Sequence, residues 1–332
     1  MVTNFSELSR ILIIRLSSLG DILLTTPLIR TIKKKNPAIQ IDFIVREKFF
    51  EAVQNNTNLS EIYKYVNSKS EKQTLFTSLL SKKYDLVIDL QNNLRSKEIL
   101  RQLHSKVHSF KKSSFKKFLL VHFKINLLKD APQIPLRYAK AAGLDNLDDE
   151  GLDFYTENIP DPKLKKDFKH IGLCPGAKHY TKRWPKEYFI DLGKKLETAG
   201  YIVVLFGGEE ESEICNEIVT TLTNAINLSN TSLLQVGVDM KMCKAIYTND
   251  SGLMHLASAL KVPVTAFFGS TVKEFGFYPY KVKSIELENI NLSCRPCTHI
   301  GRNSCPKIHF KCMKEIKPEL AFSNLNELVT AQ

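Results

Sequence analysis

Five short segments of the chain carry residue types that bind phosphate groups or move protons, and each follows an apolar run of strand length. They are residues 17–21, 89–96, 175–185, 207–209 and 249–255. In parallel α/β sheets, ligands bind beyond the carboxyl ends of the strands. The spacing therefore predicts a binding site built from these segments.

The first segment lies in the run ILIIRLSSLGDILLTTPLIR, which predicts a buried strand, a tight turn and a helix. Its turn ends in Asp21, although a helix N-terminus ordinarily attracts anionic ligands through its free N–H groups and positive dipole. Two interpretations remain open. Either Asp21 caps its own helix, or it is a reactive group of the site and lies in a turn shaped by Ser17, Ser18 and Gly20. In the second case the regular helix starts later, at the following TTP.

The last segment, NDSGLMH, opens another helix, whose apolar stripe begins two residues after Ser251. Asp250 or Ser251 can cap that helix, while the N–H groups of Ser251 and Gly252 stay available to a phosphate. Glycine also lets a ligand approach the backbone closely. The alternative is an ordinary helix cap, with His255 as a half-buried side chain.

Two further strand ends add charged groups. In PGAKHYTKRWP, Lys182 is close to the predicted start of a helix and near the only tryptophan, Trp184. In LFGGEEE, two glycines precede Glu209, whose carboxylate could accept hydrogen bonds from ribose hydroxyls. The alternatives are a solvated charge run with Trp184 as a packing anchor, and a charged first helical turn at residues 209–211.

The elements that must position these segments are strands alternating with amphipathic helices. Runs such as ILIIR, DLVIDL, YIVVLFGG and VPVTAFFGS alternate with helical patterns, which predicts parallel sheets covered on both faces. A length of 332 residues suits two domains. The polar stretch YTENIPDPKLKKDFKH marks their boundary, so we predict doubly wound Rossmann-like domains over residues 1–155 and 156–332, with a cleft between them.

The net charge and the hydropathy of the chain limit the kinds of partner that it can bind. The net charge of +12 implies an anionic partner, which is nucleic acid, a membrane surface or a phosphorylated substrate. No run reaches the roughly 18 apolar residues that span a bilayer, and the N-terminus lacks the apolar core of a signal peptide, so we expect a cytoplasmic protein. Its seven cysteines should then be mostly thiols.

Together the motifs resemble glycosyltransferase family 9, the bacterial heptosyltransferases, whose fold is the two-domain GT-B architecture. The resemblance runs over nearly the whole chain, through RLSSLGDILLTTPLIR, DLVIDLQNNLRS, PGAKHYTKRWPKEYF, NDSGLMHLASALKVPVTAFFG and the cysteines of the tail. It implies an inverting transfer of heptose or a related sugar from a nucleotide diphosphate sugar, with ADP-heptose as the expected donor. The acceptor would be a hydroxyl of the lipopolysaccharide core on phosphorylated lipid A.

The resemblance also implies roles for single residues. The C-terminal domain would bind the nucleotide sugar through Lys182, Glu209, Asp250, Ser251, Gly252 and His255. In this set Ser251 and Gly252 hold the diphosphate, and Lys182 offsets its charge. The N-terminal domain would bind the acceptor through Ser17, Ser18, Gly20 and Arg95. There Asp21 would be the general base that accepts the proton of the attacking hydroxyl.

We find no Asp-x-Asp turn suited to a metal ion at a convincing strand end. The charge of the leaving group would instead be stabilised by Lys182 and helix N–H groups, which are positioned before the reaction starts. We therefore expect activity without a divalent metal and without a required cofactor.

The stretch HSFKKSSFKKFLLVHFK, residues 108–124, interleaves lysines with phenylalanines. Such a segment could lie on an anionic membrane surface, with its rings in the interface and its lysines on lipid phosphates. The alternative is a domain helix with a buried apolar face and solvated lysines. A lipid A acceptor favours the first, which predicts peripheral association with the inner face of the cytoplasmic membrane.

The tail holds four of the cysteines, namely Cys294, Cys297, Cys305 and Cys312. Four thiols in so short a span could bind a structural zinc ion or an iron–sulfur cluster. The alternative is reduced thiols or a labile disulfide.

Two other classes of protein share some of these features. A nicotinamide-dependent oxidoreductase also has doubly wound sheets, but RLSSLGD lacks the G-x-G-x-x-G fingerprint. A nucleic-acid-binding protein fits the basic charge, but no RNP, zinc-finger or helix-turn-helix signature is evident. Only the glycosyltransferase interpretation accounts for all five segments, and it predicts no nucleic-acid partner.

Overall fold

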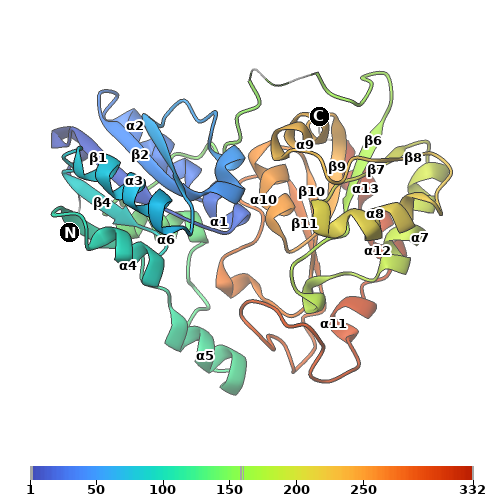
Figure 1. Ribbon diagram of the computed structural model, residues 1–332. Coiled ribbons are helices and arrows are strands. Elements are labelled where there is room, and N and C mark those ends of the chain that lie inside the picture. The colour runs from blue at the N-terminus through green and yellow to red at the C-terminus, as the bar shows by residue number, and fades with distance from the viewer. Residues whose placement is uncertain (1–2, 158, 160, 331–332) are drawn as a thin grey trace. The chain divides into compact units, whose positions relative to one another are not determined.

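The computed structural model describes residues 3–157, 159 and 161–330, and the chain forms two compact units. Unit 1 comprises Met1–Ser113 and Ile134–Tyr155, and unit 2 comprises Ser114–Gln133 and Thr156–Gln332. Figure 1 shows the strands of unit 1 from blue to teal and those of unit 2 from light green to orange. The segment from Ser114 to Gln133 lies in unit 2, whereas the sequence analysis assigned it to the N-terminal domain.

Unit 1 is built on a five-stranded parallel sheet in the order β3-β2-β1-β4-β5. Its strands are β1 Arg10–Ile14, β2 Gln40–Arg46, β3 Glu61–Tyr65, β4 Leu86–Asp89 and β5 Lys106–Ser109. The four residues from Ile11 to Ile14 are fully buried, because β1 is a central strand covered on both faces. The apolar run at the start of the chain thus forms the middle of the sheet.

Helices and short 3₁₀ turns surround this sheet. They are η1 Phe5–Glu7, α1 Leu19–Leu23, α2 Thr26–Lys35, η2 Glu47–Ala52, α3 Lys69–Leu80, α4 Leu94–Leu100 and α6 Ile134–Ala142. Helix α2 buries Leu28, Ile29 and Ile32, and three lysines occupy its last turn, where cations favour the helix dipole.

Unit 2 is built on a six-stranded parallel sheet in the order β11-β10-β9-β6-β7-β8. Its strands are β6 His170–Cys174, β7 Ile202–Leu205, β8 Ala225–Asn227, β9 Cys243–Asn249, β10 Val264–Phe268 and β11 Ser284–Glu288. All residues of β6 and β10 are buried, as expected for strands inside a doubly wound sheet.

The other elements of unit 2 are α5 Ser114–Phe123, η3 Tyr180–Lys182, α7 Lys186–Thr198, η4 Glu209–Glu211, α8 Ser212–Val219, α9 Leu233–Met240, α10 Gly252–Ala259, η5 Lys273–Phe275, α11 Lys311–Lys314, α12 Pro318–Ser323 and α13 Leu325–Val329. A large hydrophobic core joins the sheet to α7, α8, α12 and α13. Trp184 is central to it: its ring stacks on Phe267 at 4.2 Å between centroids, and its indole N–H donates to the Ile316 carbonyl at 2.8 Å. The alternative in which Trp184 is a packing anchor is therefore confirmed.

Helix α5 belongs to unit 2 for a specific packing reason. Leu120, Val121 and Leu128 form a small buried cluster with Phe275. At the end of the helix, the Lys124 amine donates to the carbonyls of residues 294 and 296, at 3.3 and 2.7 Å. The sequence left open a membrane-surface segment or a domain helix over residues 108–124, and it could not show to which domain such a helix would belong.

Within the described part of the chain, no helix is both long and apolar enough to cross a membrane.

Candidate functional site

The five predicted segments follow β1, β4, β6, β7 and β9, as the sequence pattern indicated. In unit 1 the strand order reverses between β1 and β4, which are neighbours in the sheet, and in unit 2 it reverses between β6 and β9. Ligands of doubly wound sheets bind at the carboxyl ends of strands at such a switch point. Each unit therefore presents one candidate site, and four of the five segments stand at a switch point.

In unit 1, the carboxylate of Asp21 is the centre of a set of polar contacts. Its Oδ2 atom accepts hydrogen bonds from the Ser18 N–H at 3.1 Å and from the Ser18 hydroxyl at 2.8 Å. Its Oδ1 atom lies 2.7 Å from Nη2 of Arg15 and 3.3 Å from the Tyr138 hydroxyl. Asp21 thus closes the first turn of α1, and the same carboxylate forms an ion pair through its other oxygen.

The pair between Arg15 and Asp21 is buried, with 8% and 18% of the side-chain surfaces exposed. Burial by itself raises the pKa of the Asp21 carboxyl, but the Arg15 charge and the Ser18 hydrogen bonds outweigh it, so the pKa lies below its ordinary value. Arg15 is held in turn by the Leu90 carbonyl and lies over the Tyr138 ring, 5.5 Å from its centroid. Asp21 is therefore ionised at neutral pH.

The segment after β4 braces this turn. The side-chain oxygen of Gln91 accepts hydrogen bonds from the N–H groups of Leu16 and Ser17, at 2.9 and 3.1 Å. Asp89 accepts from the Ser96 hydroxyl at 2.8 Å, which ties β4 to the first turn of α4. Arg95 lies exposed in that turn.

In unit 2, the structure brings Lys182 and Asp250 together. The Lys182 amine lies 2.7 Å from Oδ2 of Asp250, and the same oxygen accepts a 2.8 Å hydrogen bond from the Thr271 hydroxyl. Asp250 is 7% exposed, so this pair is largely shielded from water. The loop after β6 and the loop after β9 thus meet at the switch point through a charge pair.

Helix α10 begins directly beyond this pair. Ser251 occupies the position before its first residue, Gly252, and the Ser251 side chain makes no capping hydrogen bond. The Ser251 side chain therefore does not occupy the first N–H groups of α10, and a phosphate bound to these groups stays a prediction. His255 is 3% exposed and lies edge-on to the Phe277 ring, with 6.5 Å between centroids. The His255 side chain is therefore more deeply buried than in the alternative, which expected a half-buried histidine.

The segment after β7 matches the alternative of a charged helical turn. Glu209 is exposed and opens the 3₁₀ turn η4, as in the alternative of a charged first turn. Glu211 is the residue that folds back, since its carboxylate accepts the Gly208 N–H at 2.9 Å. A Cβ atom at Gly176 would come within 2.2 Å of the Glu211 side chain, so Glu211 would have to move to admit a larger residue at position 176.

The predicted zinc site is not formed. Among the described residues, no group of three or more His, Cys, Asp or Glu side chains is arranged to hold a metal ion. The reason is packing: Cys312 belongs to the hydrophobic core of unit 2, and Cys305 packs against that core. Cys294 instead lies 4.0 Å from Nε2 of His309. The seven cysteines form no disulfide in the structure, in agreement with the prediction that most of them are thiols.

Comparison with known proteins identifies the family. The model of glycosyltransferase family 9 (heptosyltransferase) matches residues 73–308. The chain belongs to glycosyltransferase family 9. The resemblance seen in the motifs is confirmed, and so is the fold class, α/β of GT-B type with two doubly wound parallel sheets.

Several family 9 proteins are similar over most of their length. The chain is 28% identical over 327 residues to lipooligosaccharide heptosyltransferase 2 of Campylobacter jejuni, covering 94% of this chain and 96% of that protein. It is 30% identical over 299 residues to lipopolysaccharide heptosyltransferase 2 of Salmonella typhimurium, covering 80% and 84%. The solved structure of E. coli ADP-heptose lps heptosyltransferase II superposes with a TM-score of 0.73 at 25% identity, covering 97% and 98%.

Four residues that contact the candidate sites were not named from the sequence: Arg15, Gln91, Tyr138 and Thr271. Arg15 carried a usable signal, because a charged residue directly after four fully buried strand residues needs a buried partner. Tyr138 carried none, since it is 117 positions from Asp21 and reaches it only through the fold.

Proposed function

We propose that this family 9 enzyme transfers heptose, with inversion at the anomeric carbon, from ADP-heptose to a hydroxyl of the lipopolysaccharide core. The observation that carries the proposal is the ionised carboxylate of Asp21, which accepts a hydrogen bond from a hydroxyl group, that of Ser18, at 2.8 Å. A general base for this reaction must likewise accept a hydrogen bond from the attacking hydroxyl. Family membership supplies the reaction class.

On the acceptor side, Asp21 is the general base of the proposal. Its four acceptor positions are taken by Ser18, Arg15 and Tyr138, so an incoming hydroxyl has to replace one of these donors. The Ser18 hydroxyl is the simplest to replace, because Ser18 is exposed and its side chain can rotate. The acceptor hydroxyl then donates to Oδ2 in its place. Ser17 and Gly20 shape the turn, and the exposed Arg95 offers a cation to acidic sugars.

On the donor side, the diphosphate would bind the first N–H groups of α10, at Ser251 and Gly252, and the Lys182 amine. Because Lys182 is already paired with Asp250, the diphosphate competes with a carboxylate for this cation. Asp250 and His255 would face the sugar or its phosphate link, and Glu209 would take the ribose hydroxyls.

The reaction itself is a substitution. The acceptor oxygen forms a bond to the anomeric carbon while the bond from that carbon to the phosphate oxygen breaks, and ADP leaves with the electron pair. The hydroxyl proton passes to Asp21 and then to water. Lys182 and the α10 N–H groups stabilise the charge on the departing diphosphate, so the proposed mechanism requires no divalent metal and no cofactor.

We also propose that the enzyme is cytoplasmic and associates peripherally with the inner face of the cytoplasmic membrane through α5. Three of its rings remain outside the cluster on Phe275: Phe115 is 70% exposed, Phe118 49% and Phe123 61%. The 31 residues from 99 to 129 contain eight Lys or Arg and no Asp or Glu. Exposed rings among cations suit the interface of an anionic bilayer.

Sedimentation with vesicles tests this association. Binding to vesicles rich in anionic lipid should fall when Phe115 and Phe123 are both replaced by serine, and should persist in Ile290→Ser, which removes another exposed apolar side chain of unit 2. No preference for anionic over neutral vesicles would refute the membrane proposal.

The activity is tested with purified protein, ADP-heptose and core acceptors that lack successive heptoses. The proposal predicts an acceptor product heavier by one heptose, released ADP, and an inverted anomeric configuration by NMR. Turnover with other nucleotide sugars but not with ADP-heptose would reject the donor. Absence of transfer to every core acceptor would reject the function.

A further inference from the structure

We propose that a second pocket of unit 2, lined by His179, Gly301, Arg302, Asn303, Ser304 and Pro306, binds a phosphate or carboxylate group of a substrate. This pocket has a volume of about 430 Å³ and shares no residue with the donor set proposed above. The inference rests on the proposed function where it names the anion as a group of a substrate, but binding of an anion in this pocket can be measured without any transfer of heptose.

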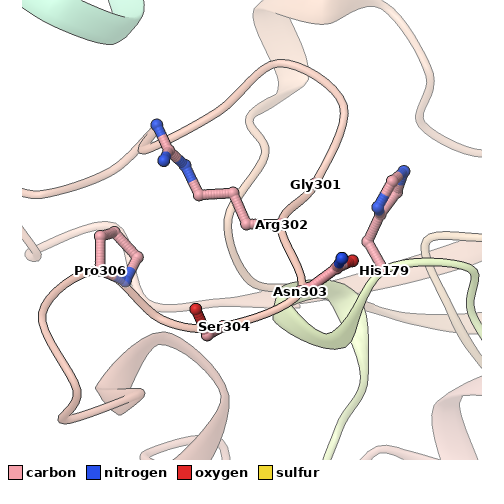
Figure 2. A pocket seen from close by; sticks show the side chains of 6 residues that line it. All are labelled: His179, Gly301, Arg302, Asn303, Ser304 and Pro306. Atoms are coloured by element: carbon pink, nitrogen blue, oxygen red, sulfur yellow. The ribbon is translucent and has the colours of Figure 1, made fainter.

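The side chains that line the pocket are donors suited to an oxyanion. Figure 2 shows the His179 imidazole and the Arg302 guanidinium on opposite sides of Gly301, with the Asn303 amide and the Ser304 hydroxyl below them. Arginine binds phosphate and carboxylate oxygens through a planar fork of N–H groups, and hydroxyl, amide and imidazole groups add further donors. The Arg302 Nε–H donates to the Cys297 carbonyl at 3.2 Å, so the Nη groups are the donors that we assign to the ligand.

The surrounding chain favours an anion over a cation. The two segments that build the pocket, residues 168–186 and 289–314, each contain five Lys or Arg and no Asp or Glu. Burial, and then the charges of Lys182, Lys178 and Arg183, lower the pKa of His179. The imidazole is therefore neutral at pH 7 and sits in a field of positive charge that an anion would offset.

The pocket is held in shape by the strand-end loop of the donor site. The Thr181 N–H donates to the Arg302 carbonyl at 3.1 Å, and the Arg302 N–H donates to the Thr181 hydroxyl at 2.9 Å. Gly301 has a φ of +130°, and a Cβ atom there would lie 2.4 Å from Cβ of His179. These contacts hold the backbone of Gly301 and Arg302 against Thr181 and His179, so this part of the pocket is formed before a ligand arrives.

The source of the anion is either the donor or the acceptor, since both proposed substrates carry phosphate. Because Thr181 immediately precedes Lys182, the pocket adjoins the loop proposed to meet the diphosphate. The chemistry that recognises either source is the same, and separate binding measurements distinguish them.

The direct test uses inorganic phosphate and the full chain, observed through the His179 ring signals by NMR. Phosphate should shift these signals and raise the pKa of His179, because a bound anion stabilises the imidazolium. Arg302→Gln should weaken phosphate affinity at least fivefold, and Lys307→Gln, on the same loop but outside the pocket, should leave it unchanged. Phosphate that leaves the His179 signals in place, or binds Arg302→Gln and wild type equally, would overturn the proposal.

Two further measurements on Arg302→Gln identify the source. A weaker Kd for ADP assigns the pocket to the donor, and an unchanged ADP affinity with a raised KM for phosphorylated acceptor, but not for dephosphorylated acceptor, assigns it to the acceptor. Gly301→Ala provides an independent variant, because its Cβ displaces His179 without removing a charge, and it should also weaken phosphate binding. The phosphate titration needs no turnover, so its result stands apart from that of the activity assay.

Discussion

Arg15 and Asp21 form a buried ion pair at the carboxyl end of β1, with Nη2 and Oδ1 2.7 Å apart. The pair explains how a carboxylate can stay ionised in a largely buried turn. Arg15, at the end of the strand, supplies a positive charge in addition to that of the helix N-terminus. The other carboxylate oxygen makes the helix-capping contacts with Ser18. One Asp21 side chain can therefore both cap helix α1 and take part in the proposed chemistry.

Removing Arg15 should change the pH dependence of the reaction. Arg15 and Ser18 hold the pKa of Asp21 below its ordinary value against the opposing effect of burial, so Arg15→Gln leaves burial less opposed and raises that pKa. The acidic limb of the kcat/KM profile should then move to higher pH, and Arg15→Lys should move it less. Arg10→Gln is the matched control, because Arg10 pairs with Asp42 at the other end of β1, 2.8 Å apart. An acidic limb that stays in place in a folded Arg15→Gln protein would contradict this role.

Lys182→Ala should weaken ADP binding about 10- to 100-fold, the range for loss of one charge-assisted hydrogen bond to phosphate. Calorimetric titration with ADP measures it. Lys186→Ala serves as control, since that lysine pairs with Glu217 on the surface of α7 and α8. Equal ADP affinity of Lys182→Ala and wild type would exclude Lys182 from the diphosphate site.

Asp250→Asn should have the opposite effect on ADP. The substitution removes a carboxylate that pairs with Lys182 and repels the diphosphate, so ADP affinity should rise by a few-fold. Transfer should nevertheless slow if Asp250 contacts the sugar. The same titration decides the first point, and weaker ADP binding in a protein with normal melting temperature would show that the pair with Lys182 is needed to position the cation.

Chelation should leave transfer intact. Lys182 and the α10 N–H groups take the place of a metal in the proposed mechanism, so prolonged dialysis against EDTA should leave initial rates unchanged. The rates are compared before dialysis, after it, and after Mg²⁺ is returned. Complete loss of activity that Mg²⁺ restores would defeat the metal-independent mechanism.

Acid should destabilise unit 1 through Asp148. The Arg30 guanidinium contacts Asp148, Asp153 and the Gly151 carbonyl, which anchors α2 to the 148–153 loop. Burial raises the pKa of Asp148, but Arg30 and Lys34 outweigh it and lower the pKa to about 2. Because the folded pKa is depressed, this stabilisation is complete above the unfolded value near pH 4 and is lost as the pH falls toward 2.

Asp148→Asn tests this linkage. It should cost about 1–2 kcal/mol of unfolding free energy at pH 7, after allowance for solvent screening, and much less at pH 2. Urea unfolding at the two pH values measures the difference. A cost that is the same at both would refute it.

The central strands and the five strand-end segments could be predicted from the sequence because buried parallel strands appear as continuous apolar runs. The edge strands β3, β5, β8 and β11 were not predicted, since their patterns are polar or too short to distinguish from loops. The assignment of α5 to unit 2 depends on its contact with Phe275, more than 140 residues away, which no local pattern encodes.

The candidate sites divide in the same way. Asp21, Lys182 and Asp250 could be found because they stand directly after strands, where ligands bind. The pair of Asp21 with Arg15 and the pair of Lys182 with Asp250 could not be predicted, because each depends on the directions in which side chains point. The possible zinc site has no support among the described residues, because cysteine spacing alone does not reveal that Cys305 and Cys312 pack with the hydrophobic core.

The most direct test of the account is the turnover of Asp21→Asn. Asparagine keeps the shape and can cap the helix, but it cannot accept the proton, so kcat should fall about 10²- to 10⁴-fold while the Kd for ADP stays near wild type. Loss of the ion pair with Arg15 should also lower the melting temperature, so rates are taken well below the transition and compared with Ser18→Ala, which keeps the carboxylate. Near-normal turnover of folded Asp21→Asn would contradict the assignment of Asp21 as the general base.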